Sequence, residues 1–176
     1  SLDYSGNELY LLHGITSTSD SVYYSGQGQS VSAGIGPAGG NLSVNIGSQE
    51  LSMSGNSTGT IGNAYYKDGT GEFTISGNTE NKTGEVDLKS GSNEVRSMTM
   101  ADSSTLYMSV GNLGMEGLSS VDRELLKITE GSDVLSVAAD LQAKTGSLAI
   151  RQGNESVQAS GDKINKTGSL SAVIDG

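Results

Sequence analysis

The sequence predicts an all-β fold: an antiparallel meander or sandwich of short, hairpin-connected strands with little or no helix. Three observations predict it. Apolar and polar residues alternate with a period of two, Gly, Ser and Asn interrupt the alternation about every 10 to 13 residues, and a Thr-Gly turn followed by alternation recurs. Such spacing is typical of strands joined by tight turns and corresponds to about a dozen strands.

The expected strands follow one another along the chain. The first is the apolar run from Leu9 to Ile15, and the last runs from Leu170 to Ile174. Between them, alternating apolar residues mark strands at 42–46, 51–53, 73–75, 86–88, 106–110, 135–137 and 148–150. Residues 121–128 also fit a helix with Ser120 as its N-cap, but we favour a strand that turns at residues 130–133.

A weak internal repeat supports the hairpin pattern. Thr-Gly followed by alternating residues begins at Thr70, Thr83 and Thr145, and degenerate copies begin at Thr58 and Thr167. Lys precedes three of the five copies, at Lys82, Lys144 and Lys166. We expect the glycine to supply the positive φ of a tight turn, after which the next strand begins.

The single proline, Pro37, lies in the clearest break of the pattern, a Gly-Pro-Ala-Gly-Gly segment. It predicts an N-terminal, low-charge strand segment at 1–36, a candidate inter-subunit strand, and a main β domain at 37–176. One continuous domain over 1–176 is the alternative.

Composition predicts a thin core and excludes several classes of protein. Only 34% of the 176 residues are hydrophobic, with one Phe and no Trp. A net charge of −10, with Lys and Arg scattered singly, disfavours a nucleic-acid partner. No apolar run is long enough to span a membrane, and the absence of Cys excludes disulfides and thiolate metal sites. The first residue is Ser1, which we interpret as the result of leader-peptide removal and export to the cell surface.

No motif predicts an enzyme or a cofactor site. Residues 34–39 match GxGxxG and residues 55–59 match GxSxG, but both chemistries need a helix where the alternation predicts a strand or a turn. His13 is the only histidine and has no evident partner for catalysis or metal binding. Calcium held between subunits, for example by Asp68 with Glu72 or by Asp20, is left open, although no calcium-loop pattern occurs. A polysaccharide-cleaving β-helix is the least favoured alternative.

Two kinds of residue are candidates for surface roles. Five Asn-x-Ser/Thr sequons are candidates for N-linked glycan, and all except Asn41 fall in expected turns: Asn41, Asn56, Asn81, Asn154 and Asn165. The tyrosine pairs Tyr23-Tyr24 and Tyr65-Tyr66 should each place one ring on either side of a strand. An outward ring suits a subunit contact, since it buries area and keeps its hydroxyl wet.

Unprotected sheet edges decide the functional class. Soluble monomers shield edge strands with Lys, Pro or bulges, yet no Lys or Arg precedes Lys67 and Pro occurs once. We therefore expect the terminal strands to pair with copies of the same chain, making it a homopolymer. The candidate assembly residues are Leu9, Tyr10, Leu11, Leu12, Ile15, Tyr23, Tyr24, Tyr65, Tyr66, Leu170, Val173 and Ile174.

With its Gly/Ser/Asn/Thr-rich strands, Lys-Thr-Gly turns, sequons and lack of Cys, the chain resembles archaeal and bacterial extracellular structural proteins: sheath, S-layer or fibre subunits. The resemblance lies in composition along the whole chain. It implies export, self-assembly into a filament, sheath or surface lattice, and no catalytic residues. The alternative is a secreted adhesin or carbohydrate-binding β-sandwich module, for which the four paired tyrosines are the only aromatic candidates.

Overall fold

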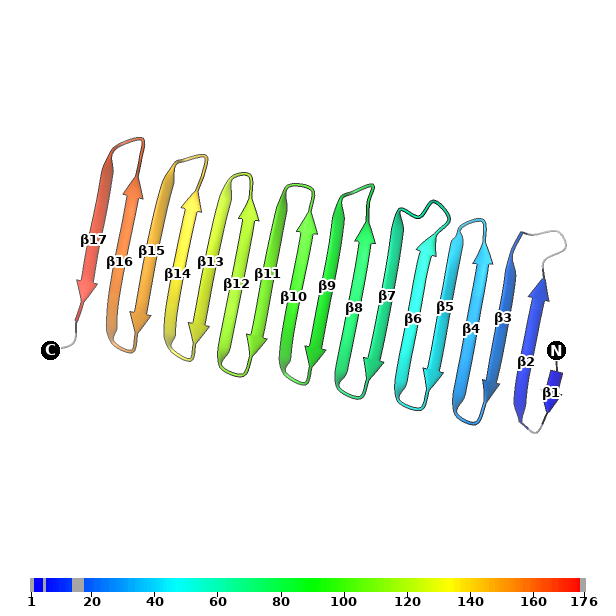
Figure 1. The fold of residues 1–176 in the computed structure, drawn as a ribbon. Helices are drawn as coiled ribbons and strands as arrows, with labels where there is room; N and C mark the ends of the chain where they lie inside the picture. The colour runs from blue at the N-terminus through cyan, green and yellow to red at the C-terminus, as the bar shows by residue number, and fades with distance from the viewer. Residues whose placement is uncertain (1, 5, 14–17, 175–176) are drawn as a thin grey trace. The chain divides into compact units, whose positions relative to one another are not determined.

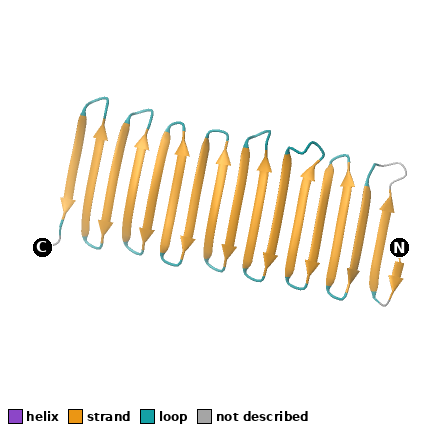
Figure 2. Cartoon of the chain, viewed as in Figure 1, coloured by secondary structure: helices purple, strands orange, loops and turns teal. Residues whose placement is uncertain are grey.

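A computed structural model describes residues 2–4, 6–13 and 18–174. The described residues form strands and turns with no helix, which confirms the predicted all-β, antiparallel, hairpin-connected fold (Figures 1 and 2). The chain divides into two compact units, residues 1–91 and 92–176. The break expected between residues 36 and 37 lies inside the first unit, at the turn that joins two paired strands.

The first unit is a meander in which each strand pairs with its neighbour along the chain. Its strands are β1 (Leu2–Tyr4), β2 (Asn7–His13), β3 (Asp20–Gly26), β4 (Gln29–Gly36), β5 (Gly39–Ile46), β6 (Gln49–Asn56), β7 (Ile61–Asp68), β8 (Gly71–Asn78) and β9 (Thr83–Ser90). The predicted strand at Leu9 is therefore β2, and Ile15 lies outside the described residues.

The second unit repeats this plan. Its strands are β10 (Asn93–Met100), β11 (Ser103–Val110), β12 (Leu113–Ser120), β13 (Arg123–Glu130), β14 (Asp133–Asp140), β15 (Thr145–Gln152), β16 (Glu155–Asp162) and β17 (Thr167–Val173). Strand β13 confirms that residues 121–128 belong mainly to a strand and not to a helix. The prediction of about a dozen strands was too low, because several strands contain too few apolar residues to show the alternation of apolar and polar residues by which strands were predicted.

Two-residue turns set the length of the hairpins. Six of them begin with a glycine of φ between 56° and 59°, followed by Ser, Thr or Asn, and these glycines recur every 20 or 22 residues: Gly47, Gly69, Gly91, Gly111, Gly131 and Gly153. A positive φ at the first central residue matches the twist of the flanking strands, and glycine adopts it without steric cost.

Lys-Thr-Gly marks a different, four-residue turn, and our assignment of its positive φ was wrong. The Lys takes the left-handed conformation, with φ of 52° at Lys82, 56° at Lys144 and 53° at Lys166, while the following Thr and Gly already belong to the next strand. The reason is that an Asn or Asp closing the preceding strand fixes the turn. The Oδ1 of Asp140, for example, accepts the backbone N–H of Ala143 at 2.7 Å.

The same closure recurs before Lys166 and affects a titrating group. Asp162 accepts hydrogen bonds from the backbone N–H groups of Asn165 at 2.9 Å and Ile164 at 2.8 Å, and from the Asn165 side-chain amide at 2.6 Å. These donors, those of Asn165 first, hold the pKa of Asp162 below its ordinary value, because they favour the charged carboxylate.

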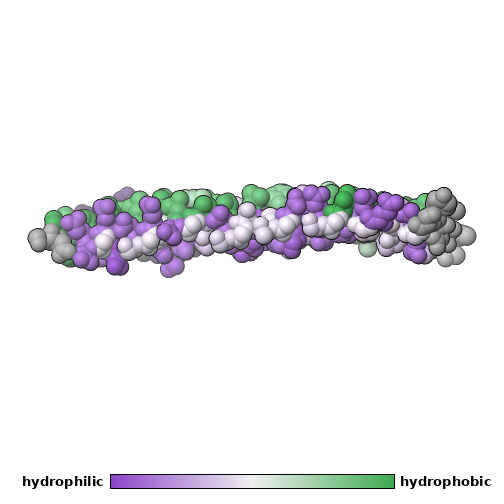
Figure 3. All heavy atoms as spheres, turned by 90° about the horizontal axis from the view of Figure 1, so that it is seen from below, coloured by the Kyte–Doolittle hydropathy of each residue, from purple (hydrophilic) through white to green (hydrophobic). Residues whose placement is uncertain are grey.

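No hydrophobic side chain among the described residues is buried. In each unit the meander is a single layer, so side chains stand on two faces and no second sheet covers either face within that unit. Within each unit, Figure 3 shows hydrophobic residues mainly along one side of the strands, with some hydrophilic residues among them, and hydrophilic residues mainly along the other side. In place of the predicted thin core, each unit therefore has an apolar face that no other part of the same unit covers among the described residues.

Candidate assembly surfaces

The register of the first unit aligns its apolar residues in two continuous rows on one face, which we name the apolar face. Neighbours within a row are direct cross-strand partners, whose side chains touch across the sheet. The first row is Leu9, Tyr24, Val31, Val44, Leu51, Tyr66, Phe73 and Leu88. The second row is Leu11, Val22, Ala33, Leu42, Met53, Ala64, Ile75 and Val86.

The opposite side of the first unit, its polar face, carries mainly Ser, Asn and Thr together with most of the charge. Seven charged residues of the strands stand there: Glu8, Glu50, Lys67, Glu72, Glu85, Asp87 and Lys89. Lys67 and Glu72 are cross-strand partners 3.2 Å apart. The hydrogen bond and charge of Glu72 raise the pKa of Lys67 above its ordinary value.

The second unit also has an apolar face, and that face carries charge. Its two rows are Val95, Met108, Met115, Ile128, Leu135, Ile150, Val157 and Ala172, and Ser97, Leu106, Gly117, Leu126, Val137, Leu148, Ala159 and Leu170. By register, four acidic residues share this side of the sheet: Glu124, Glu130, Asp133 and Glu155. The two units therefore expose apolar faces of different charge.

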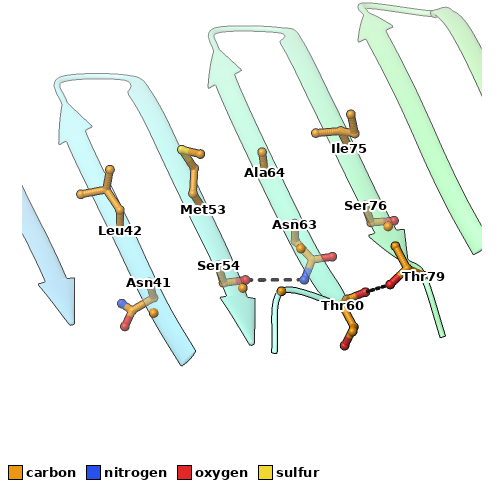
Figure 4. A pocket seen from close by; sticks show the side chains of 15 residues that line it. Asn41, Leu42, Met53, Ser54, Thr60, Asn63, Ala64, Ile75, Ser76 and Thr79 are labelled. Atoms are coloured by element: carbon orange, nitrogen blue, oxygen red, sulfur yellow. Dashed lines mark hydrogen bonds between the residues drawn. The ribbon is translucent and has the colours of Figure 1, made fainter. Parts of the chain in front are cut away.

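A shallow apolar groove of about 700 Å³ lies on the apolar face of the first unit (Figure 4). Leu42, Met53, Ala64 and Ile75 of the second row line it (Figure 4). Its floor is a row of paired glycines, Gly40, Gly55, Gly62 and Gly77. The turn that holds Thr60 closes one end, where the Thr60 carbonyl accepts hydrogen bonds from the Thr79 backbone N–H at 2.8 Å and hydroxyl at 3.3 Å.

Strand β17 is an edge strand without the usual protection. All seven of its residues are exposed and uncharged, and among the described residues of its unit it pairs only with β16. Leu170 is 77% exposed and Val173 is 56% exposed, and Ile174, just beyond the strand, is 76% exposed. Such a strand offers unpaired backbone groups to another chain.

Strand β2 is partly open in the first unit. Among the described residues, β1 pairs with Asn7 to Leu9, and Leu11 to His13 have a strand partner on the β3 side alone. Leu11 is 65% exposed and Leu12 is 67% exposed. Apart from Ile15, the predicted assembly residues at the two ends of the chain thus lie on or beside strands that are at least partly open among the described residues of their own units.

The tyrosine pairs straddle the sheet of the first unit, as expected from strand geometry. Tyr24 and Tyr66 stand on the apolar face, and Tyr23 and Tyr65 stand on the polar face. Tyr23 packs against Tyr10 across the strands, with ring centroids 6.0 Å apart. No tyrosine lines the groove of the first unit, so the paired aromatics do not combine there into a sugar-stacking cleft.

The sequons differ in how accessible they are. Asn81, Asn154 and Asn165 lie in exposed turns, and Asn41 lies in β5. Asn56 was expected in a turn, but it ends β6, where it pairs with Gly39. Its side chain closes the turn that follows: Oδ1 accepts the backbone N–H groups of Thr60 at 2.9 Å and Ile61 at 3.0 Å, and Nδ2 donates to the Thr60 hydroxyl at 2.8 Å.

The residues weighed for metal binding are held apart or engaged with other side chains. His13 Nδ1 and Asp20 Oδ1 form an exposed hydrogen-bonded pair on the apolar-face side. Asp68 lies on that side too and accepts a hydrogen bond from Gln49 at 3.2 Å, whereas Glu72 stands on the polar face beside Lys67. Among the described residues, no three potential metal ligands come together.

The two glycine motifs are parts of hairpins. Residues 34–39 end β4, turn at Pro37-Ala38 and begin β5, and residues 55–59 end β6 and enter its turn. In the described part of the chain, no helix has the length and apolar character needed to cross a bilayer.

Sequence reasoning found most of the apolar residues but missed the rows they form. Period two shows that Met53 and Ile75 each face one side of a strand, but only the pairing register shows that Ala64 lies between them. The spacing of the Gly-Ser, Gly-Thr and Gly-Asn turns is the signal that could have fixed this register. Comparison of the chain with models of protein families, with curated proteins and with solved structures finds no significant match.

Proposed function

We propose that the protein is a structural subunit that self-assembles through its β-strand edges into an extracellular filament, sheath or surface lattice. The observation that carries this proposal is β17, an exposed edge strand with no charged residue and no Pro, which no other described residue of its unit covers on its open side. Because its backbone groups on one side lack partners in the unit, pairing with a strand of another copy would satisfy them.

The absence of a buried core supports the same function. The stability of a small domain normally depends on how much apolar surface it buries. That surface can be buried against a second layer of the same domain or against a partner. Neither unit has a buried hydrophobic side chain among its described residues. Assembly with copies would provide the burial that the described residues of each unit lack within that unit.

Charging the edge tests the proposal. Ser171→Lys combined with Val173→Lys places two positive charges on β17, both on the side of the sheet away from Leu170. We expect the wild-type chain to form polymers visible by negative-stain electron microscopy, and this double variant to lose them, because Lys on an edge strand opposes strand addition.

Ser147→Lys combined with Ala149→Lys is the matched control, because it places two positive charges, also two residues apart, on the same side of β15, an interior strand of the unit. It should leave the polymers intact. A wild-type chain that light scattering finds monomeric up to millimolar concentration would contradict the proposed function.

A further inference from the structure

We propose that the apolar face of the first unit is a second assembly contact, where it packs face to face against the same face of a second copy. This inference rests on the proposed function, since it adds a contact between layers to the contact between edges. The two rows place sixteen side chains on this face, and several are well exposed, including Met53 at 48% and Tyr66 at 40%. Ile35, which stands beside the rows on the same face, is 66% exposed.

The apolar face of the first unit is large enough to bury the area that a stable protein–protein interface buries. If each side chain of the two rows loses roughly 50 Å² of accessible surface, the contact buries on the order of 800 Å² on each copy, which is the size of a standard specific interface. Stacked sheets pack about 10 Å apart with strands nearly aligned. The groove over the glycine row gives room for side chains from the facing sheet.

The distribution of charge favours a second copy as the occupant. The chain carries a net charge of −10, so copies repel one another unless they meet through neutral surface. Neither row of the first unit holds an ionisable residue, and among the described strand residues the ionisable side chains on that side are the hydrogen-bonded pair His13 and Asp20, and Asp68. The apolar face of the second unit, with its four acidic residues, is less suited to contact an acidic copy.

The glycines that floor the groove fit this arrangement. An added Cβ at Gly77 would have no atom of this chain within 4 Å, and one at Gly62 would meet only the Ser54 carbonyl at 3.9 Å. Neither glycine has a positive φ. The chain's own packing therefore does not require glycine at these positions, whereas a closely approaching second sheet would.

Sedimentation equilibrium of the edge-charged variant tests the contact through the apolar face separately from the contact through the strand edge. In the edge-charged variant (Ser171→Lys with Val173→Lys), we expect sedimentation equilibrium to show a dimer. Adding Met53→Glu should raise its dissociation constant at least about 100-fold, because a buried carboxylate without a partner is costly. Adding Ser52→Glu instead places the same charge one residue away on the polar face and should leave the dimer unchanged.

A second measurement guards against a variant that fails to fold. The chain contains no Cys, so a single introduced thiol reports its own environment. In the edge-charged background, Met53→Cys should react with a maleimide at least 10-fold more slowly in the dimer than after dilution to monomer. Ser52→Cys should react at the same rate in both states. Far-UV circular dichroism checks that all variants keep their strands.

Three outcomes would overturn the face contact while leaving the edge function untouched. They are an edge-charged chain that stays monomeric at 100 μM, a monomer in which Met53→Cys is protected by the chain itself, and a monomer that co-sediments with neutral phosphatidylcholine vesicles. Conversely, a wild-type chain that dimerises through this face but never polymerises would overturn the proposed function and retain the face contact.

Discussion

At the scale of single residues, the Lys-Thr-Gly turns place a strained conformation on a residue that is not glycine. Lys82, Lys144 and Lys166 all have φ near 50° to 60°. A left-handed conformation costs about 1–2 kcal/mol for a residue with a Cβ. The cost is offset locally by the Asn or Asp that fixes the turn, as Asp140 does through the Ala143 N–H.

We therefore predict that Lys144→Gly stabilises the protein. Relief of the left-handed strain should exceed the extra chain entropy of glycine, raising the free energy of unfolding by about 0.5–1 kcal/mol. Lys144→Val should lower it by more than about 1 kcal/mol, because a β-branched residue tolerates positive φ poorly. Urea denaturation of the edge-charged variant measures both.

Gln142→Gly is the control within the same turn, since Gln142 does not have a positive φ. It should bring no gain and a small loss. Equal stabilisation by glycine at both positions would show that general turn flexibility, and not the left-handed conformation of Lys144, sets the stability.

At the scale of elements, the hairpin is the repeating unit. In the second unit, β12 and β14 both begin after a glycine-led turn and their first residues, Leu113 and Asp133, stand on the same side of the sheet. Residues 113–132 are therefore one complete hairpin with its turn, 20 residues long. Removing it would bring β14 to the position of β12 with its faces unchanged.

We predict that deleting residues 113–132 leaves a folded chain. Leu135 would then pair with Met108 and Val137 with Leu106, so apolar residues still meet apolar residues. Far-UV circular dichroism per residue should match the wild-type spectrum, and the unfolding transition should stay cooperative.

Deleting 113–133, one residue more, is the control. Because side chains alternate across a strand, this change would move the apolar residues of β14 to the polar face or force the turn to rearrange. It should unfold or lose a large part of its stability. If both deletions behave alike, the register is not what holds the unit together.

At the scale of the whole chain, net charge opposes assembly. With −10 on every copy, polymerisation works against mutual repulsion. We predict that raising NaCl from 10 to 150 mM, which shortens the Debye length from about 30 to about 8 Å, lowers the concentration needed for polymerisation several-fold. Light scattering against protein concentration measures it.

Calcium chloride at matched ionic strength provides the comparison. An equal effect would mean that screening alone acts, and a much larger one would identify calcium held between subunits. Polymers that dissolve as NaCl rises would contradict the prediction, because they would depend on ion pairs between copies.

The sequence was enough to predict the all-β class and the strands that are rich in large apolar residues, and strand pairing supplied the rest. Alternation marks a strand wherever large residues such as Phe73 and Ile75 recur, and the turn expected at residues 130–133 is found at Gly131-Ser132. Strands with few apolar residues were missed, which lowered the predicted count. Asn56 was assigned to a turn because its pairing with Gly39 cannot be seen before the register is known.

The meander has a consequence for how the chain acquires its structure. Within each unit, every strand pairs with the strand that precedes or follows it, so no segment waits for a distant one. Contacts of such short sequence separation carry little loop-closure entropy and form fast. A chain that emerges end first, from a ribosome or an export channel, can therefore fold one hairpin at a time, in the order in which its residues appear.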